Sequence, residues 1–235
     1  MAVKQVVILA GGLGTRLGPL TKVAPKPMMD VYGRPFLEHL ILRLKARGFD
    51  DFILLVGHLG EQIIQYFADG SELGVRIRYS VEKTLLGTGG ALKQAEAMLD
   101  ERFMVVYGDS YLPLDYAKPM ALFETSGTQG LITVYDNIRP KIAKNNVVLG
   151  TDGLVKLYDK KTERSSMNGV EAGVLFLRRQ TVAGLEPGRF SLEQTLFPKL
   201  IKGGDLMGYV TSARFWDIGT LEGLEAARRT LHDLD

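Results

Sequence analysis

The feature that most constrains the fold is a continuous apolar run that ends in a glycine-rich loop. Residues 6–10 are all apolar, and Gly11, Gly12 and Gly14 follow directly. Such a run is typical of a strand buried on both faces of a parallel sheet. Glycines after the strand let backbone N–H groups converge on an anion, because no Cβ obstructs them. The start of the chain therefore predicts an α/β fold with an anion-binding loop at the carboxyl end of its first strand.

Alternating strand and helix patterns continue through the first half of the chain. Apolar residues at helical spacing alternate with short apolar or alternating runs, and glycine or proline separates them. This order predicts a parallel sheet with helices on both faces. The predicted strands are 6–10, 52–56, 75–81, 103–107 and 131–135, and the predicted helices are 35–47, 60–68, 89–99 and 120–126.

The pattern changes after Asp136. Residues 147–149, 154–158 and 170–177 read as strands with short turns, such as 151–153, and indicate hairpins. A helix over 192–201, a strand over 206–210 and a closing helix over 221–231 follow. No linker rich in proline or serine separates the two halves. We therefore predict a single domain over 1–235, in which the second half supplies a substrate-binding lobe.

Composition and charge exclude several classes of protein. Twenty-nine basic and 27 acidic side chains give a net charge of +2, without the basic excess typical of nucleic-acid-binding proteins. No run approaches the roughly 18 apolar residues of a membrane span, and the N-terminus lacks a signal-peptide pattern. The absence of cysteine excludes disulfides and thiolate chemistry. We expect a cytoplasmic protein with neither a nucleic acid nor a membrane as its partner.

Two basic side chains flank the glycine loop. Arg16 follows Gly14 by two residues, and Lys26 stands between two prolines. Fixed positive charge beside converging N–H groups favours a phosphate ligand over a simple tight turn. The G-x-x-x-x-G-K-[ST] motif is absent, and G-x-G-x-x-G fails because its third glycine falls at Leu17. The sequence thus disfavours a P-loop NTPase and a dinucleotide-dependent dehydrogenase.

The whole set of motifs resembles one enzyme family. A-G-G-x-G-T-R-L followed by P-K-P is similar to the N-terminal signature of the sugar-1-phosphate nucleotidyltransferases, also called nucleotide-sugar pyrophosphorylases. The resemblance continues through L-G-T-G-G-A, G-D, D-K, E-A-G and W-D-I-G-T at residues 86–91, 108–109, 159–160, 171–173 and 216–220. The short length and F-S-L-E at 190–193 are most similar to the D-glycero-D-manno-heptose 1-phosphate guanylyltransferase branch.

The resemblance implies a fold and a division of labour along the chain. The expected fold is an α/β, Rossmann-like, doubly wound mixed sheet of the nucleotide-diphospho-sugar transferase type. Residues 1–136 form the expected nucleotide-binding half. Residues 137–235 form the expected sugar-phosphate-binding half and closing helix.

The reaction of this family joins a nucleoside triphosphate to a sugar 1-phosphate and releases pyrophosphate. The attacking phosphate oxygen is ionised at pH 7 and needs no general base, whereas charge neutralisation and in-line positioning at the α-phosphorus are required. The resemblance implies that Arg16 and Lys26 are catalytic and that Asp109 and Asp217 hold Mg²⁺. Without the resemblance, either aspartate alone is a turn or cap residue.

Two segments are implied to bind the nucleotide. Glycines after residue 86 would permit close approach of a flat base, whereas the structural alternative is a helix N-cap at Thr88. The implied nucleotide-binding residues are Leu9, Ala10, Gly11, Gly12, Gly14, Thr15, Glu82, Gly87, Gly89 and Asp109.

The implied sugar-phosphate-binding residues are Lys160, Glu171, Gly173 and Glu193. Lys161 replaces the proline usual after this lysine, and Glu171 stands where many relatives have asparagine. Glu193 also suits the first turn of a helix without any ligand, and Lys160 with Lys161 also suits a solvated surface. Whether Glu193 and His58 contact a ligand stays open at this stage.

The resulting hypothesis is a Mg²⁺-dependent sugar-1-phosphate nucleotidyltransferase, with GTP and a manno-heptose 1-phosphate as the best guess. A uridylyl- or cytidylyltransferase acting on another sugar or non-sugar phosphate is the rival within the class. A non-catalytic nucleotide-sugar-binding protein and a glycosyltransferase are the rivals outside it. The Asp-x-Asp motif of glycosyl transfer is missing, because Ser110 and Tyr111 follow Asp109. A homodimer is compatible with the sequence.

Overall fold

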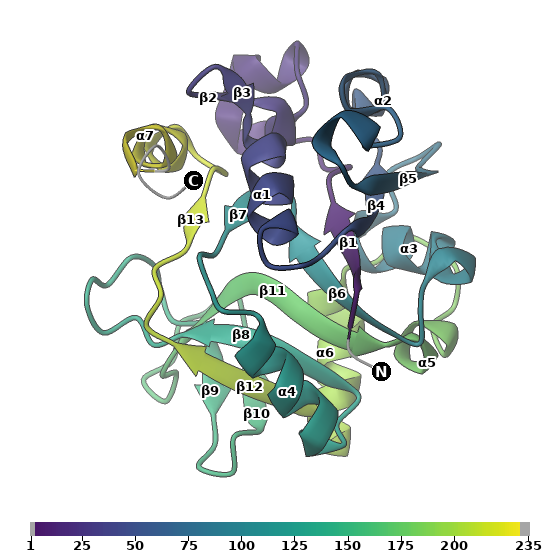
Figure 1. Ribbon diagram of the computed structural model, residues 1–235. Helices are drawn as coiled ribbons and strands as arrows, with labels where there is room; N and C mark the ends of the chain where they lie inside the picture. The colour runs from purple at the N-terminus through teal and green to yellow at the C-terminus, as the bar shows by residue number, and fades with distance from the viewer. Residues whose placement is uncertain (1–2, 231–235) are drawn as a thin grey trace.

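A seven-stranded mixed sheet forms the centre of the protein in a computed structural model that describes residues 3–230 (Figure 1). The strand order is β12-β8-β11-β6-β1-β4-β5. Its parallel core consists of β6, β1, β4 and β5, as the sequence predicts. These strands span Arg102–Tyr107, Gln5–Leu9, Asp51–Val56 and Arg76–Val81.

Helices cover both faces of this sheet. Along β1, Val6 and Ile8 point into one core, which contains side chains of α1, α2, α4 and α7, whereas Val7 points into the other, with α3, α5 and α6. Figure 1 shows α1 and α4 in front of the sheet and α6 behind it. The helices span Phe36–Lys45, Gly60–Phe67, Gly87–Gln94, Ala117–Ser126, Arg179–Ala183, Leu192–Gly203 and Leu221–Thr230, in order from α1 to α7.

The second half of the chain completes the sheet differently from the prediction. The pair β9 (Val147–Leu149) and β10 (Val155–Tyr158) is a hairpin, as predicted. In contrast, β11 (Val170–Arg178) is an inner strand of the main sheet, antiparallel to both β6 and β8 (Gly130–Tyr135). The reason is the length of β11. It has nine residues, eight of them buried, and the two short hairpin strands could not bury a strand of that length. The parallel partner of β8 is β12 (Leu206–Thr211).

Short elements surround the carboxyl edge of the sheet. The glycine loop leads into two 3₁₀ helices, η1 (Thr15–Lys22) and η2 (Lys26–Met28), which the sequence patterns did not predict. Two small antiparallel pairs join β2 (Asp30–Val31) to β3 (Arg34–Pro35), and β7 (Ser110–Tyr111) to β13 (Trp216–Asp217). The second pair ties distant parts of the chain together beside the glycine loop.

Some helix bounds also differ from the prediction. The helix expected over 89–99 is α3, from Gly87 to Gln94, followed by the 3₁₀ turn η4 (Glu96–Met98). Ser191 is the N-cap of α6, where its hydroxyl accepts a hydrogen bond from the Gln194 N–H at 3.2 Å. The end of the predicted closing helix, Leu231, lies outside the described residues. None of the helices within residues 3–230 is long and apolar enough to cross a membrane.

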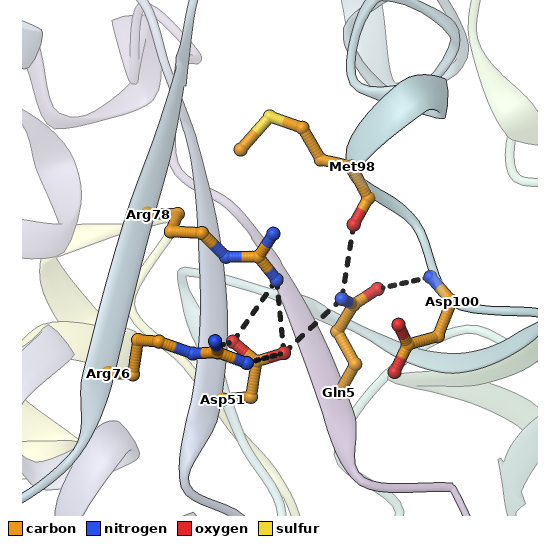
Figure 2. Close-up of polar contacts among 6 residues, drawn as sticks. All are labelled: Gln5, Asp51, Arg76, Arg78, Met98 and Asp100. Carbon is orange, nitrogen blue, oxygen red and sulfur yellow. Dashed lines mark hydrogen bonds and ion pairs between the residues drawn. The ribbon is translucent and has the colours of Figure 1, made fainter.

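The amino edge of the sheet carries a buried polar cluster around Asp51 (Figure 2). Its carboxylate accepts hydrogen bonds from Arg78 at 3.0 and 3.2 Å, from Arg76 Nε at 3.1 Å and from Gln5 Nε2 at 3.3 Å. The Gln5 side-chain amide also donates to the Met98 carbonyl and accepts a hydrogen bond from the Asp100 N–H. This cluster ties the starts of β1, β4 and β5 together at the end of the sheet opposite the glycine loop.

Replacement of Asp51 by alanine should therefore reduce stability without changing the chemistry of the opposite edge. Hydrogen bonds to charged groups contribute about 1.5–3 kcal/mol when a partly buried partner is lost. Thermal denaturation of Asp51→Ala should show a Tm lower by several degrees. Arg76→Ala is the matched control, because its side chain is 68% exposed and its ion pair should contribute less than about 1 kcal/mol. Equal losses for both variants would contradict this ranking.

Candidate active site

Two adjacent cavities open at the carboxyl edge of the sheet. The first has a volume of about 380 Å³ and is lined by residues at the ends of β1, β4 and β6, together with the glycine loop. The second has a volume of about 580 Å³ and is lined mainly by residues from the second half of the chain. Tyr107 and Asp109 line both cavities. A ligand in one cavity would therefore meet a ligand in the other at these two residues.

The glycine loop forms one wall of the first cavity. Leu9, Ala10, Gly11, Gly12, Gly14 and Thr15 all line it, which is where the sequence predicted the nucleotide. A Cβ on Gly11 would lie 2.3 Å from Glu82 Oε1 and 3.0 Å from the Gly57 nitrogen, so a side chain there would displace the Glu82 carboxylate and press on the backbone of Gly57. Gly14 has a φ of 62°, in the left-handed region that glycine adopts without strain. The loop thus owes its shape to these glycines.

His58 supports this loop from outside the cavities. Its backbone N–H donates to the Gly11 carbonyl at 3.2 Å. Its ring Nε2 lies 2.8 Å from the Thr21 carbonyl oxygen. His58 is not among the residues that line either cavity. His58 therefore connects the glycine loop to η1.

Lys26 and Asp109 form an ion pair where the two cavities meet. Their side chains are only 12% and 24% exposed, so solvent screens this pair less than it would a surface pair. Lys26 comes from η2, and Asp109 lies two residues after the end of β6. The structure thus brings together two predicted residues that are 83 positions apart in the sequence.

Asp217 and Arg16 lie beside this pair. Asp217 pairs with Ser110 across β13 and β7, and the Ile218 N–H donates to the Asp109 carbonyl at 3.0 Å. A Cβ on Gly219 would lie 2.6 Å from Asp217 Oδ1 and 2.7 Å from Arg16 Nη2, so both charged groups converge over this glycine.

Two like charges face each other at this point. Desolvation in the cleft and the negative charge of Asp109 raise the pKa of Asp217, whereas the charges of Lys26 and Arg16 oppose that rise. Among residues 3–230, no cluster of three or more His, Cys, Asp or Glu side chains is arranged to hold a metal ion. A cation here would depend on the two carboxylates and on oxygens of a bound substrate.

The start of α3 closes the far side of the first cavity. Glu82, Gly87 and Thr88 line it, and the Glu82 carboxylate accepts the Leu86 N–H at 2.7 Å. Burial raises the pKa of Glu82, although this hydrogen bond opposes the shift. The N-cap of α3 is Leu86, so the alternative interpretation of Thr88 as an N-cap is wrong.

The structure gives Gly89 a different role from the one expected. A Cβ at this position would lie 2.4 Å from the Phe190 ring, and the Gly89 N–H donates to the Phe190 carbonyl at 3.0 Å. Gly89 is not among the residues that line the cavity. Its small size allows close packing against the segment before α6, and a contact with the nucleotide stays a prediction from the sequence.

Lys160, Glu171 and Gly173 line the second cavity, as expected for residues that contact a second substrate. Gly173 has a φ of 84°, and its N–H donates to Glu171 Oε1 at 2.6 Å. Burial raises the pKa of Glu171 to about 7, while Lys160 and the Gly173 N–H oppose the shift. Glu171 therefore changes its charge near neutral pH inside the cavity.

This pKa predicts a pH-dependent stability. An unfolded glutamate ionises near 4.5, whereas Glu171 in the fold ionises near 7, so the folded state holds its proton longer. Stability should therefore fall as the pH rises between these values, because the unfolded state releases the proton first. Glu171→Gln removes this titration. The Tm of the variant minus the Tm of the wild type should therefore increase as the pH rises from 5 to 8. A constant difference in Tm across this range would contradict the assignment.

Glu193 is held by hydrogen bonds to two residues that do line the cavities. Its carboxylate accepts hydrogen bonds from the hydroxyls of Thr88, at 3.0 Å, and Tyr107. Glu193 is not among the lining residues of either cavity, and the sugar contact stays a prediction from the sequence. The sequence interpretation missed this network because the partners are 105 and 86 positions away.

Several other lining residues were also missed. Arg189 lines the first cavity, and Lys144, Lys161 and Arg214 line the second. Arg214 lies over the ring of Trp216 at 5.6 Å. Arg189 directly precedes F-S-L-E, and Arg214 lies two residues before W-D-I-G-T, so their nearness to these motifs was a usable signal.

Comparison with known proteins places this site in a family. Residues 5–233 match the family described as nucleotidyl transferase. Mannose-1-phosphate guanylyltransferase of Mycobacterium tuberculosis is 35% identical over 228 residues, which are 94% of this chain and 63% of that protein. UTP–glucose-1-phosphate uridylyltransferase of Synechocystis is 31% identical, over 92% of this chain and 60% of that protein. The chain thus spans about three-fifths of the length of these two relatives.

Two further comparisons bear on the branch and the fold. D-glycero-alpha-D-manno-heptose 1-phosphate guanylyltransferase of Campylobacter jejuni is 43% identical over 114 residues, 48% of this chain and 51% of that protein. The crystal structure of HddC from Yersinia pseudotuberculosis complexed with GMP-PN superposes with a TM-score of 0.81 at 30% identity, covering 97% of this chain and 99% of that chain. Because the family match extends over residues 5–233 and the fold is shared, this chain belongs to the nucleotidyl transferase family.

Proposed function

We propose that this protein transfers a nucleotidyl group from a nucleoside triphosphate to a sugar 1-phosphate and releases pyrophosphate. One observation carries the proposal: two cavities meet at Tyr107 and Asp109, and the cations of Lys26 and Arg16 lie at or beside this meeting point. The first cavity, with its glycine loop, suits the nucleotide. The second, with Lys160 and Glu171, suits the sugar phosphate.

The proposed chemistry forms one bond and breaks one. An oxygen of the sugar phosphate attacks the α-phosphorus, and the bond from that phosphorus to the bridging oxygen of pyrophosphate breaks. The electron pair leaves with pyrophosphate, and no proton moves, because the attacking oxygen is already ionised. Lys26, Arg16 and the loop N–H groups would stabilise the negative charge on the phosphoryl oxygens and hold the reacting groups in line.

We infer that Asp109 and Asp217 hold Mg²⁺ when both substrates are bound. The two carboxylates flank the meeting point of the cavities, and the raised pKa of Asp217 reflects a desolvated site in which Asp109 adds negative charge. A hard divalent cation bound by one or two carboxylates and by substrate phosphates is the usual arrangement for Mg²⁺. Such a cation would neutralise charge on the triphosphate and the departing pyrophosphate.

Our best guess for the substrate pair is GTP with a manno-heptose 1-phosphate. The local 43% identity to the Campylobacter heptose 1-phosphate guanylyltransferase and the fold match to HddC complexed with GMP-PN support this guess. The similarity to the Synechocystis uridylyltransferase supports UTP with another sugar phosphate as the second candidate. A few contacts in a pocket decide base choice, so related chains can differ in it.

The test is pyrophosphate release by the purified full chain with four nucleoside triphosphates and a panel of sugar 1-phosphates. The panel includes mannose and manno-heptose forms, and each reaction is run with Mg²⁺ and with EDTA. We expect release with GTP and manno-heptose 1-phosphate that EDTA abolishes. Release with UTP or CTP alone would overturn the proposed base and leave the reaction class intact.

Silence across the panel, together with a Tm raised by a nucleotide, would instead favour the non-catalytic nucleotide-sugar-binding alternative. Release of a nucleoside diphosphate in place of pyrophosphate would favour glycosyl transfer. The cytoplasmic location and the homodimer stay predictions from the sequence. Gel filtration with light scattering tests the second of them.

A further inference from the structure

Glu193 joins the walls of the two cavities. Its carboxylate accepts hydrogen bonds from Thr88, which lines only the first cavity, and from Tyr107, which lines both. Glu193 is on the first turn of α6, Thr88 is in α3 and Tyr107 ends β6. The Glu193 carboxylate therefore connects α6 to α3 and to the end of β6, although it lines neither cavity.

The backbone around this carboxylate fixes the position of α3. The Leu192 N–H donates to Thr88 Oγ1 at 2.9 Å, and the Gly89 and Gly90 N–H groups donate to the Phe190 carbonyl at 3.0 and 3.2 Å. The Phe190 N–H in turn donates to the Leu86 carbonyl at 2.9 Å. The start of α3 and the start of α6 are therefore bonded to each other, and Glu193 connects both to Tyr107.

The position of Tyr107 matters for the second cavity as well. Asp109 follows it by two residues, and Tyr107 itself lines the second cavity together with Glu171. Its hydroxyl donates a hydrogen bond to Glu193, which holds the ring in this wall. A shift of the Tyr107 side chain would alter a wall that both substrates share.

We propose that Glu193 is a positioning residue that couples the two cavities: through Thr88 and Tyr107 it makes binding on the nucleotide side set the shape of the sugar-phosphate side. The proposal rests on the proposed function for the identity of the two substrates. It replaces the expectation that Glu193 binds the sugar itself. The role comes from a hydrogen-bonded network spanning both walls.

The decisive variant is Thr88→Val, which removes one hydroxyl on the nucleotide side at nearly constant volume. If Glu193 couples the cavities, this variant should raise the KM for the sugar phosphate about fivefold or more, the lower end of measured couplings between sites. The same substitution in a Glu193→Ala background should add little, because the connection is already lost. Thr88 and Tyr107 bond different oxygens of Glu193, so Glu193→Gln keeps the side-chain length but an acceptor for only one of them, and it should raise the same KM by less than Glu193→Ala does.

Ser191→Ala is the matched control for a merely structural effect. It removes the N-cap of the same helix, two residues from Glu193, and should lower the Tm without raising either KM. A sugar-phosphate KM that Thr88→Val leaves unchanged, while Glu193→Ala raises it, would overturn the proposal and favour a direct sugar contact by Glu193.

A cycle of melting temperatures tests the network without any turnover. Thr88→Val and Tyr107→Phe should each destabilise the wild type more than they destabilise Glu193→Ala, since all three residues share hydrogen bonds. Additive effects would overturn the network. If the wild type releases no pyrophosphate in any assay, the proposed function fails, and this cycle still decides the inference about Glu193.

Discussion

Replacing Asp109 by asparagine should reduce kcat by about a hundredfold or more, with the fold retained. Asp109 lines both cavities, forms the ion pair with Lys26 and is one of the two carboxylates proposed to hold Mg²⁺. Asparagine has nearly the same size but carries no charge, so it loses both electrostatic interactions. Removing one electrostatic group that stabilises the transition state commonly lowers kcat by about 10²–10³-fold.

The measurement is steady-state pyrophosphate release with a titration of Mg²⁺, alongside circular dichroism. The half-saturating Mg²⁺ concentration should also rise for Asp109→Asn. Asp115→Asn is the matched control, because Asp115 is an exposed aspartate after the same strand and lines neither cavity. Near wild-type turnover of Asp109→Asn would show that the assignment of Asp109 is wrong.

Replacing Lys26 by alanine should have an effect of similar size. The Lys26 side chain is 12% exposed, lines the first cavity and pairs with Asp109, which lines both cavities, so we expect its ammonium group to contact the reacting phosphate. Its loss removes positive charge from the reacting phosphoryl group and leaves Asp109 without its ion-pair partner. We expect kcat to fall about a hundredfold or more, and arginine at this position to restore only part of it, because its planar fork differs from a point charge.

Lys22→Ala is the control for Lys26→Ala. Lys22 is an exposed lysine at the end of η1, four residues earlier, and lines neither cavity. Turnover and KM should stay within about twofold of the wild type, as for surface positions away from the site. An unchanged kcat for Lys26→Ala would move Lys26 to a structural role in η2.

The part of the site that is local in sequence could be predicted from the sequence. The apolar run before Gly11 indicates a buried strand, and the glycines indicate a tight turn at its carboxyl end, which is where the first cavity lies. Asp109 likewise lies two residues after the end of a buried strand. In each case the strand direction alone brings the residue to the active edge of the sheet.

The parts that depend on packing between distant segments could not be predicted. Phe190 packs on Gly89 and leaves no room there for a side chain, and Glu193 bonds to Thr88 and Tyr107, which are 105 and 86 positions away in the sequence. The inner position of β11 depends on partners on both sides that the strand pattern does not name. The cluster around Asp51 likewise joins three strands and gives no motif.

The measurement that tests the central claim most directly follows the oxygen atoms. A sugar 1-phosphate carrying ¹⁸O in its phosphate group is incubated with the nucleoside triphosphate, Mg²⁺ and the full chain, and both products are analysed by ³¹P NMR and mass spectrometry. The account predicts that all the label is retained in the nucleotide sugar and that pyrophosphate contains none. Label in released inorganic phosphate, or a nucleoside diphosphate as the second product, would contradict it.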